Sequence, residues 1–306
     1  MSFNQYFNAK LLLTAEYLVL NGAKALAVPL KFGQRLEVDE NRQGYISWQS
    51  VAHDGSTWFS GTYALADFNS IESNNPDIAK HPQRLMQAAK TLNPGFLSLS
   101  QGCHVKSTLN YPLPWGLGSS STLIAAVAAW AEIDPFVLHF SVSKGSGYDI
   151  ACAISPGPVL YSLNGNRPTF QPVKFAPTFA DNLFFVYQGK KQDSAEGIKQ
   201  FCNRSRGVNA ADVEQGSLLT GKMLNAVSLH EFEQVITEHE KLISSILGMP
   251  TLKETIFHDL PGAVKSLGAW GGDFCMLTWQ ADRASLEDYL KSKGLKIGFN
   301  FNDIVL

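Results

Sequence analysis

The chain has 306 residues, of which 45% are hydrophobic and 17% are charged, and its formal net charge is −2. This length and composition predict one large or two medium-sized globular domains with a hydrophobic core. The near-neutral charge argues against a broadly basic surface, so we do not expect nucleic acid as a partner.

The cysteines and the early apolar run indicate a cellular location. Four widely spaced cysteines contain no Cys-x-x-Cys pair, which argues against a zinc site or a disulfide framework and favours a reducing compartment. The apolar run at 11–20 is interrupted by Glu16 and is too short to span a bilayer. We therefore expect no membrane partner and a cytoplasmic location.

The first third of the chain predicts mainly β-structure. Four strands are expected near its start, at 10–13, 17–20, 25–28 and 34–38. Asn21-Gly22 is a hairpin turn signal between the second and third of them. Short aromatic runs separated by glycines predict hairpins over 43–68, and a helix is expected over 82–92.

A loop rich in proline, glycine and serine lies between a predicted strand at 104–110 and a predicted Ala-rich helix at 123–130. Gly116 and Gly118 allow positive φ and a close approach to a ligand. The serines can cap the helix, and a helix N-terminus attracts anions such as phosphate. The simpler alternative is a capped helix after a glycine-rich turn. No Gly-Lys-Ser/Thr follows, so the loop is not a Walker A motif.

Asp149 follows a Gly-Ser-Gly-Tyr segment and opens an apolar run that predicts a helix. The preceding helix is expected to begin with Asp134 as N-cap and Pro135 in the first turn. Taken alone, Asp149 is best explained as a first-turn carboxylate that the helix dipole favours.

The second half predicts alternating strands and helices after a proline-rich stretch at 165–179, where we expect a domain boundary. Strands are expected at 160–163, 182–187 and 296–299, and helices at 194–203, 208–224, 229–247 and 284–293. The charges of the helix at 229–247, among them Glu240, predict a solvated face rather than a site. A glycine-rich stretch at 261–273 leads into an apolar strand.

Three of these regions resemble, in the same order, motifs of the GHMP kinases, the superfamily named for galactokinase, homoserine kinase, mevalonate kinase and phosphomevalonate kinase. The first region keeps Lys10 and Glu16 in register with the family motif. Asn8, Ala9 and Ala15 stand where the family usually has Pro, Gly and Gly. The second region is the Pro-x-x-x-Gly-Leu-Gly-Ser-Ser loop that begins at residue 112.

The third region, Lys-x-x-Gly-Ala-Trp-Gly-Gly-Asp from Lys265, has Trp270 in place of a glycine. The segment at 145–149 is similar to the one that carries the catalytic aspartate in these kinases, and 147–151 spells the Gly-Tyr-Asp-Ile-Ala label of a bacterial subgroup. Diphosphomevalonate decarboxylases share the fold but lack this Gly-Ser-Gly-x-Asp arrangement, so the resemblance favours a kinase.

The resemblance implies an α+β fold with two domains. Residues 1–165 would be the ATP-binding half, similar to ribosomal protein S5 domain 2, and residues 166–306 would be the ferredoxin-like half. It also implies ATP and Mg²⁺ as cofactors. The loop residues implied to bind ATP are Pro114, Gly116, Leu117, Gly118, Ser119, Ser120 and Ser121.

The resemblance further assigns chemical roles. Asp149 would accept or orient the acceptor's proton, and Lys10 would keep it ionised and offset charge on the transferred group. Ser120 would lie near Mg²⁺. The segment 136–144 offers no second carboxylate for the metal. His139 is its nearest polar candidate, though packing or facing solvent is the simpler explanation. The residues implied to bind substrate are Glu16, Gly147, Tyr148, Gly268 and Ala269.

The implied activity is ATP-dependent phosphorylation of mevalonate or phosphomevalonate in isoprenoid precursor synthesis. The Glu16-Tyr17 pair, the Gly-Ser-Gly-Tyr-Asp form and the Gly-Gly-Asp ending of the third motif favour phosphomevalonate, whereas the short chain favours mevalonate. Two alternatives stay open: a GHMP kinase for another small alcohol, such as a sugar or a homoserine-like compound, and a nucleotide- or metabolite-binding protein without phosphotransfer. A homodimer is compatible with the sequence.

Overall fold

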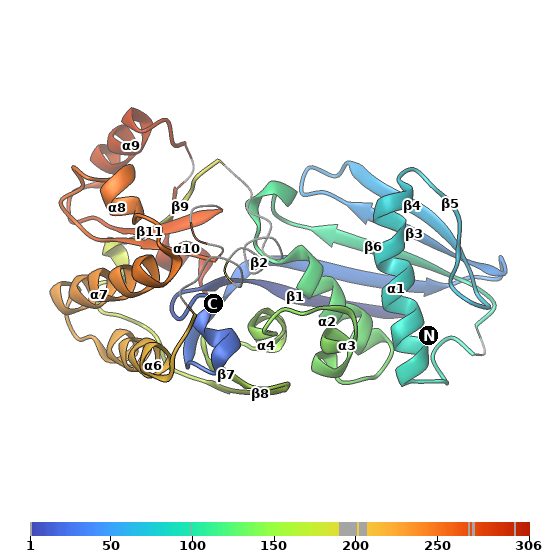
Figure 1. Cartoon of the computed structure of the whole chain (residues 1–306). Helices are drawn as coiled ribbons and strands as arrows, with labels where there is room; N and C mark the ends of the chain where they lie inside the picture. The colour runs from blue at the N-terminus through green and yellow to red at the C-terminus, as the bar shows by residue number, and fades with distance from the viewer. Residues whose placement is uncertain are drawn as a thin grey trace. The chain divides into compact units, whose positions relative to one another are not determined.

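The computed structural model describes residues 2–98, 100–189, 201, 207–268, 270, 273–296 and 298–306 (Figure 1). The chain divides into two compact units, each assembled from separate stretches of sequence. Unit 1 comprises Met1–Ala9, Phe32–Leu113 and Gly118–Ile154, and unit 2 comprises Lys10–Lys31, Pro114–Leu117 and Ser155–Leu306. The expected boundary after residue 165 stays a prediction.

The strands of unit 1 form a twisted sheet in the order β5-β4-β3-β6-β2. They are β2 (Ala25–Glu40), β3 (Tyr45–Val51), β4 (Thr57–Ala64), β5 (Ser70–Ser73) and β6 (Cys103–Leu109). The pair β3–β6 is parallel, and the other neighbours are antiparallel. Unit 1 contributes the second half of β2, whose residues 34–40 pair with β6. Residues of β3 alternate between half-buried and buried, as the aromatic-rich pattern predicted.

Four helices complete unit 1: α1 (Pro76–Leu92), α2 (Ser119–Trp130), α3 (Pro135–Val142) and α4 (Tyr148–Ile154). Helix α1 packs against β4, β5, α2 and α3 (Figure 1). It begins six residues before the predicted start, because Asn75 caps the N–H groups of Asp77 and Ile78 and Pro76 fits the first turn. The predicted cap of α3 is confirmed, since Asp134 accepts from Phe136 N and Val137 N.

The predicted strand at 17–20 and the Asn21-Gly22 hairpin are wrong. After β1 (Phe3–Leu12), which pairs with β2, Leu18–Asn21 form the short 3₁₀ helix η1, and Gly22 ends it with φ 94°. Ala15 and Tyr17 both have positive φ, 60° and 63°, which breaks the extended conformation that the apolar run suggested. Burial of Leu18 and Val19 in this turn explains why the run is apolar.

Unit 2 contains a second, four-stranded antiparallel sheet in the order β10-β11-β9-β12. Its strands are β9 (Leu183–Tyr187), β10 (Val264–Ser266), β11 (Phe274–Thr278) and β12 (Gly298–Asn300). The first half of β2 pairs with β7 (Val159–Asn164), which pairs with β8 (Arg167–Pro172). The strands predicted around 160–163, 182–187 and 296–299 are therefore present.

The described helices of unit 2 include three that were predicted, near 208–224, 229–247 and 284–293, and three short ones that were not. They are η3 (Ala180–Asn182), α6 (Ala210–Asn225), α7 (Leu229–Leu247), α8 (Leu252–Thr255), α9 (Arg283–Ser292) and α10 (Phe301–Ile304). The bounds of α7 match the prediction, because Ser228 caps its start and Gly248, with φ 64°, ends it. The helix predicted at 194–203 lies outside the described residues except for Phe201. Among the described helices, none combines the length and apolar character needed to cross a bilayer.

Candidate active site

The serine-bearing turn of unit 1 begins helix α2. Gly118, with φ 96°, occupies the N-cap position, and its carbonyl accepts from Ser121 N and Thr122 N at 3.0 Å each. The predicted serine cap is therefore wrong, since a glycine stands at the cap and no side chain bonds there. The first turn consequently presents backbone N–H groups without a side-chain cap, which suits an anion.

Asp149 lies in the first turn of α4, and its carboxylate is bound to the turn at the start of α2. Ser121 Oγ donates to Asp149 Oδ2, and Ile150 N donates to Oδ1 at 3.2 Å. Gly147, with φ 84°, supplies the carbonyl that accepts from Ile150 N and Ala151 N. The structure thus brings the Ser119–Ser121 turn and the Gly147–Asp149 segment together, as the motifs predicted.

Neighbouring side chains hold these two segments in place. Thr122 Oγ1 donates to the buried Gln34 Oε1 at 2.7 Å and so ties α2 to β2. His139 is buried, and its Nε2 lies 3.2 Å from Gly145 O, which fixes the turn before α4. Of the two simple positions expected for His139, packed or facing solvent, the structure has the packed one. Ser120 is exposed, and its Oγ lies 3.4 Å from His81 Nε2.

The serine partner of Asp149 was not identified from sequence. Ser121 was assigned only to the phosphate loop, and the two residues are 28 positions apart. The contact of His81 with Ser120 was not predicted either, because a histidine within a helix carries no local signal. Burial first, and then the cation of Arg84, lower the pKa of His81, so its ring is mainly neutral at neutral pH.

Unit 2 contains the other half of the loop and the predicted catalytic lysine. Lys10 N donates to Leu117 O at 3.2 Å, and the Lys10 side chain is largely buried. Tyr187 Oη donates to Pro114 O at 3.0 Å. Trp115 packs edge-on against Phe274 and Phe299. The 114–117 segment is therefore anchored on the four-stranded sheet.

Asp273 approaches the loop closely at Gly116. A Cβ atom added to Gly116 would lie 2.3 Å from the Asp273 carboxylate, and Gly116 has φ 68°. Only glycine can adopt this positive φ and also leave room for the carboxylate without moving neighbouring atoms. The sequence indicated the glycine but not the carboxylate beside it, although Asp273 closes the third motif.

Glu16 is not exposed in unit 2 but lies in a buried ionic cluster. It is 1% exposed and forms an ion pair with Lys265, which also lies 3.1 Å from Glu240 Oε1. Glu240 in turn accepts from Ser266 N at 3.1 Å and from Ser266 Oγ at 2.9 Å. The prediction that Glu240 belongs to a solvated face is therefore wrong: α7 turns this one carboxylate inwards, where Lys265 compensates its charge.

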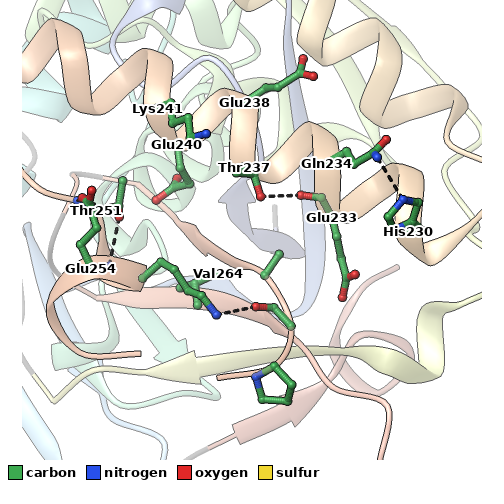
Figure 2. Close-up of a pocket in the computed structure, with 14 residues that line it drawn as sticks. His230, Glu233, Gln234, Thr237, Glu238, Glu240, Lys241, Thr251, Glu254 and Val264 are labelled. Carbon is green, nitrogen blue, oxygen red and sulfur yellow. Dashed lines mark hydrogen bonds between the residues drawn. The ribbon is translucent and has the colours of Figure 1, made fainter. Parts of the chain in front are cut away.

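A pocket of about 630 Å³ lies between α7, α8 and residues 261–264, and Figure 2 shows its polar lining. Its charged groups mostly stabilise the local structure: Lys253 Nζ donates to Gly262 O at 2.9 Å, and Glu254 completes the capping box of α8 with Thr251. None of the predicted site residues lines this pocket. We therefore do not assign the catalytic site to it.

The remaining predicted residues have the following places. Gly268 lies in unit 2 after β10, with φ 68° and open space where a Cβ would be. Tyr148 is the first residue of α4 in unit 1. Ala269 lies outside the described residues. The roles assigned to all these residues stay predictions.

Comparison with known proteins identifies the fold. No protein-family model and no curated protein sequence matches the chain. Among solved structures, the mevalonate kinase of Methanococcus jannaschii is 17% identical, with 98% of each chain covered and a TM-score of 0.70. The phosphomevalonate kinase of Streptococcus pneumoniae, solved with phosphomevalonate and AMPPNP, is 18% identical over 98% of this chain and 99% of that one, with a TM-score of 0.70. The galactokinase of Lactococcus lactis is 10% identical over 99% and 93% of the two chains, with a TM-score of 0.65.

The chain therefore has the two-domain α+β fold of the GHMP kinases. The resemblance that the three sequence motifs indicated is confirmed at the level of the fold. Identities of 10–18% do not carry the activity of any one neighbour over to this chain.

Proposed function

We propose that this protein is an ATP-dependent kinase of the GHMP type that phosphorylates a small molecule. The observation that supports this most strongly is the hydrogen bond from Ser121 to Asp149. It joins a carboxylate to an uncapped helix N-terminus, so one site offers both an acceptor for a proton and N–H donors for phosphate.

The residues present fit a nucleotide. Gly116 and Gly118 have positive φ, and the first-turn N–H groups of α2 follow directly. In this proposal the backbone of Leu117–Ser121 would hold the phosphates of ATP, and the Ser120 hydroxyl would be available to Mg²⁺. The metal would neutralise phosphate charge. Among the described residues no group of three or more His, Cys, Asp or Glu could hold a metal ion.

Asp149 and Lys10 have separate tasks in this proposal. Asp149, oriented by Ser121, accepts or directs the proton of the acceptor hydroxyl. Lys10 offsets negative charge on the transferred group. An acceptor that is already a phosphate monoester needs less from Asp149 as a base, because its attacking oxygen is ionised.

The acceptor that we favour is mevalonate or phosphomevalonate. The support is that structural neighbours are described as mevalonate kinase and phosphomevalonate kinase, and that the Gly-Ser-Gly-Tyr-Asp segment matches this group. The galactokinase neighbour, solved with galactose, keeps a sugar as the alternative acceptor.

The test is ADP formation by purified protein with ATP, Mg²⁺ and each acceptor in turn. Mevalonate, phosphomevalonate, galactose and homoserine cover the alternatives, and an assay without acceptor measures background ATP hydrolysis. Absence of ADP above that background with every acceptor would contradict the proposed activity.

The residue-level test is Asp149→Asn, with Asp288→Asn as control because Asp288 is an exposed carboxylate on α9. Loss of one acid–base partner should lower kcat by about 10²- to 10⁴-fold, while the control should keep wild-type kcat. An Asp149→Asn variant with undiminished kcat would exclude Asp149 as the base.

A second candidate is a nucleotide-binding protein without phosphotransfer. Two observations favour it: Trp270 is buried where the family motif has a glycine, and Ala15 has φ 60° where the family usually has glycine. ATP binding by calorimetry together with no product in a single-turnover assay would support this candidate over the kinase.

A further inference from the structure

Four ionisable side chains form a buried cluster in unit 2 that the proposed chemistry does not use. They are Glu16, His239, Glu240 and Lys265, and none is more than 3% exposed. Burial of charges costs several kcal/mol per ion unless partners compensate it. A cluster of this kind therefore needs an explanation beyond filling space.

Lys265 is the centre of the cluster. Its ammonium group contacts Glu16 Oε1, lies 3.1 Å from Glu240 Oε1 and donates to Ser266 O at 2.5 Å. The ammonium group therefore makes two hydrogen bonds, to Glu16 and Ser266, and a further ion pair with Glu240. These three partners belong to different elements: the turn after β1, helix α7 and strand β10. One buried cation thus joins three segments that are far apart in sequence.

The cluster has one negative charge too many if both carboxylates are ionised. His239 does not compensate it, because its Nε2 accepts the Ala15 N–H at 2.8 Å, which leaves the ring proton on Nδ1 and the ring neutral. Burial, and then Lys265, lower the pKa of His239. Cys275 on β11 stays a thiol, because burial raises its pKa.

A proton shared by the carboxylates resolves the imbalance. Burial raises the pKa of Glu16 to about 7 against the opposing effect of Lys265, and burial likewise raises that of Glu240. Glu16 Oε2 has no hydrogen-bond partner among the described residues and lies 3.5 Å from His239 Nε2. This oxygen is therefore where the extra proton would reside.

The cluster is linked to the predicted catalytic lysine within the same unit. Glu16 follows Lys10 by six residues, and the intervening Ala15 is held by His239. Lys10 N in turn holds Leu117 O of the phosphate loop. Ser266, on the other side of the cluster, lies two residues before Gly268. The cluster thus connects the first and third motifs.

We infer that Lys265 is a positioning residue for the proposed phosphoryl transfer: its buried ammonium group fixes the turn after β1 against α7 and β10, and thereby fixes the strand end that carries Lys10. This inference rests on the proposed function. Lys265 itself touches neither ATP nor acceptor in this scheme. A displacement of a catalytic group by about 1 Å can cost about 10²-fold in rate, which sets the expected effect.

The test uses Lys265→Met, Glu240→Gln and the double variant, with Lys291→Met as control because Lys291 is an exposed lysine on α9. Lys265→Met buries two carboxylates without a cation, so a large loss of thermal stability is expected. Glu240→Gln keeps an acceptor for Lys265 and for Ser266, and it should keep kcat within about threefold of wild type. The double variant removes one of the uncompensated carboxylates and should regain most of the lost stability.

The decisive measurement is kcat of the folded double variant at a temperature well below its Tm. We expect kcat to be about 10²-fold below wild type, with the dissociation constant of an ATP analogue changed less than about threefold. A double variant with wild-type kcat would overturn the inference, because Lys265 would then serve only to neutralise charge. Wild-type protein that forms no ADP would instead overturn the proposed function.

Discussion

The buried carboxyl of Glu16 predicts an unusual dependence of stability on pH. Most buried acids that are paired with cations stabilise a protein as pH rises, because they ionise more easily in the folded state. Glu16 should do the opposite, since burial outweighs the attraction of Lys265 and raises its pKa from 4.5 to about 7. The perturbation that isolates this effect is Glu16→Gln, which removes the titration and keeps the shape.

The sign and size of this pH dependence follow from the pKa of Glu16 in the unfolded chain and in the folded protein. In the unfolded chain Glu16 releases its proton near pH 4.5, whereas in the folded protein it does so only near pH 7. The folded state therefore binds the extra proton between these values, and stability falls as pH rises through this window. The two pKa values differ by 2.5, which corresponds to about 3 kcal/mol of unfolding free energy. This contribution is lost as pH rises through about 7.

The assay is urea unfolding of wild type and Glu16→Gln at pH 4.5, 5.5, 6.5 and 7.5, at constant ionic strength. The stability of wild type relative to the variant should decrease by about 3 kcal/mol over this range. Glu214→Gln, at an exposed position on α6, is the matched control and should follow wild type at every pH. If the stability of wild type relative to Glu16→Gln stays constant or increases with pH, Glu16 does not hold the extra proton.

The two remaining contact-based predictions concern the anchors of the loop. Ser121→Ala removes the hydrogen bond to Asp149 and should lower kcat by about 10- to 100-fold, the scale of one bond to a charged group; a change below threefold in steady-state assays would mean that Asp149 needs no orienting partner. Trp115→Ala removes a buried ring that contacts Phe274 and Phe299 and should cost about 3–5 kcal/mol in urea unfolding; a loss under 1 kcal/mol would show that the anchor contributes little.

The elements that sequence predicted correctly are those whose signals are local. Helix α7 has an apolar stripe, a serine N-cap and a glycine at its end, so both bounds could be read from neighbouring residues. The start of α3 could also be predicted from neighbouring residues, because Asp134 accepts hydrogen bonds from N–H groups two and three residues ahead. Such interactions depend little on the rest of the fold.

The turn at 14–22 was mispredicted because distant contacts determine it. The N–H of Ala15 is held by His239, 224 residues away, and Thr14 Oγ1 accepts from Thr220 Oγ1 across 206 positions. These bonds maintain positive φ values that alanine and tyrosine rarely adopt alone. An apolar run with no glycine gave no warning of them.

In the candidate site, too, local signals were predicted from the sequence and distant contacts were not. Motif spacing predicted Gly116, Asp149 and Lys10 as site residues, but not the side chains that lie against Gly116 and Asp149 in the structure. Lys265 and Glu16 are 249 positions apart, and Glu240 lies on a helix whose other charges are mostly exposed. No local pattern distinguishes the one carboxylate that turns inwards, so the cluster became visible only from the fold.

The close approach of Asp273 to Gly116 supports one further prediction, in which the backbone and packing contributions can be separated. Gly116→Ala places a non-glycine residue at φ 68° and a Cβ 2.3 Å from the carboxylate. Gly165→Ala is the matched control in the same unit, because Gly165 has φ 61° and no atom within 4 Å of its Cβ position. Both variants should lose about 1–2 kcal/mol for the left-handed backbone, and Gly116→Ala should lose about 1–3 kcal/mol more through overpacking.

The second step of this prediction is rescue by Asp273→Gly, which removes the carboxylate and relieves its own φ of 48°. In urea unfolding, Gly116→Ala combined with Asp273→Gly should recover the packing contribution, whereas Gly165→Ala combined with Asp273→Gly should show simple additivity. Equal losses in the two alanine variants would mean that the loop does not lie against Asp273. In that case the glycine at 116 would be required only by its backbone conformation, and Asp273 would have no part in holding the phosphate loop.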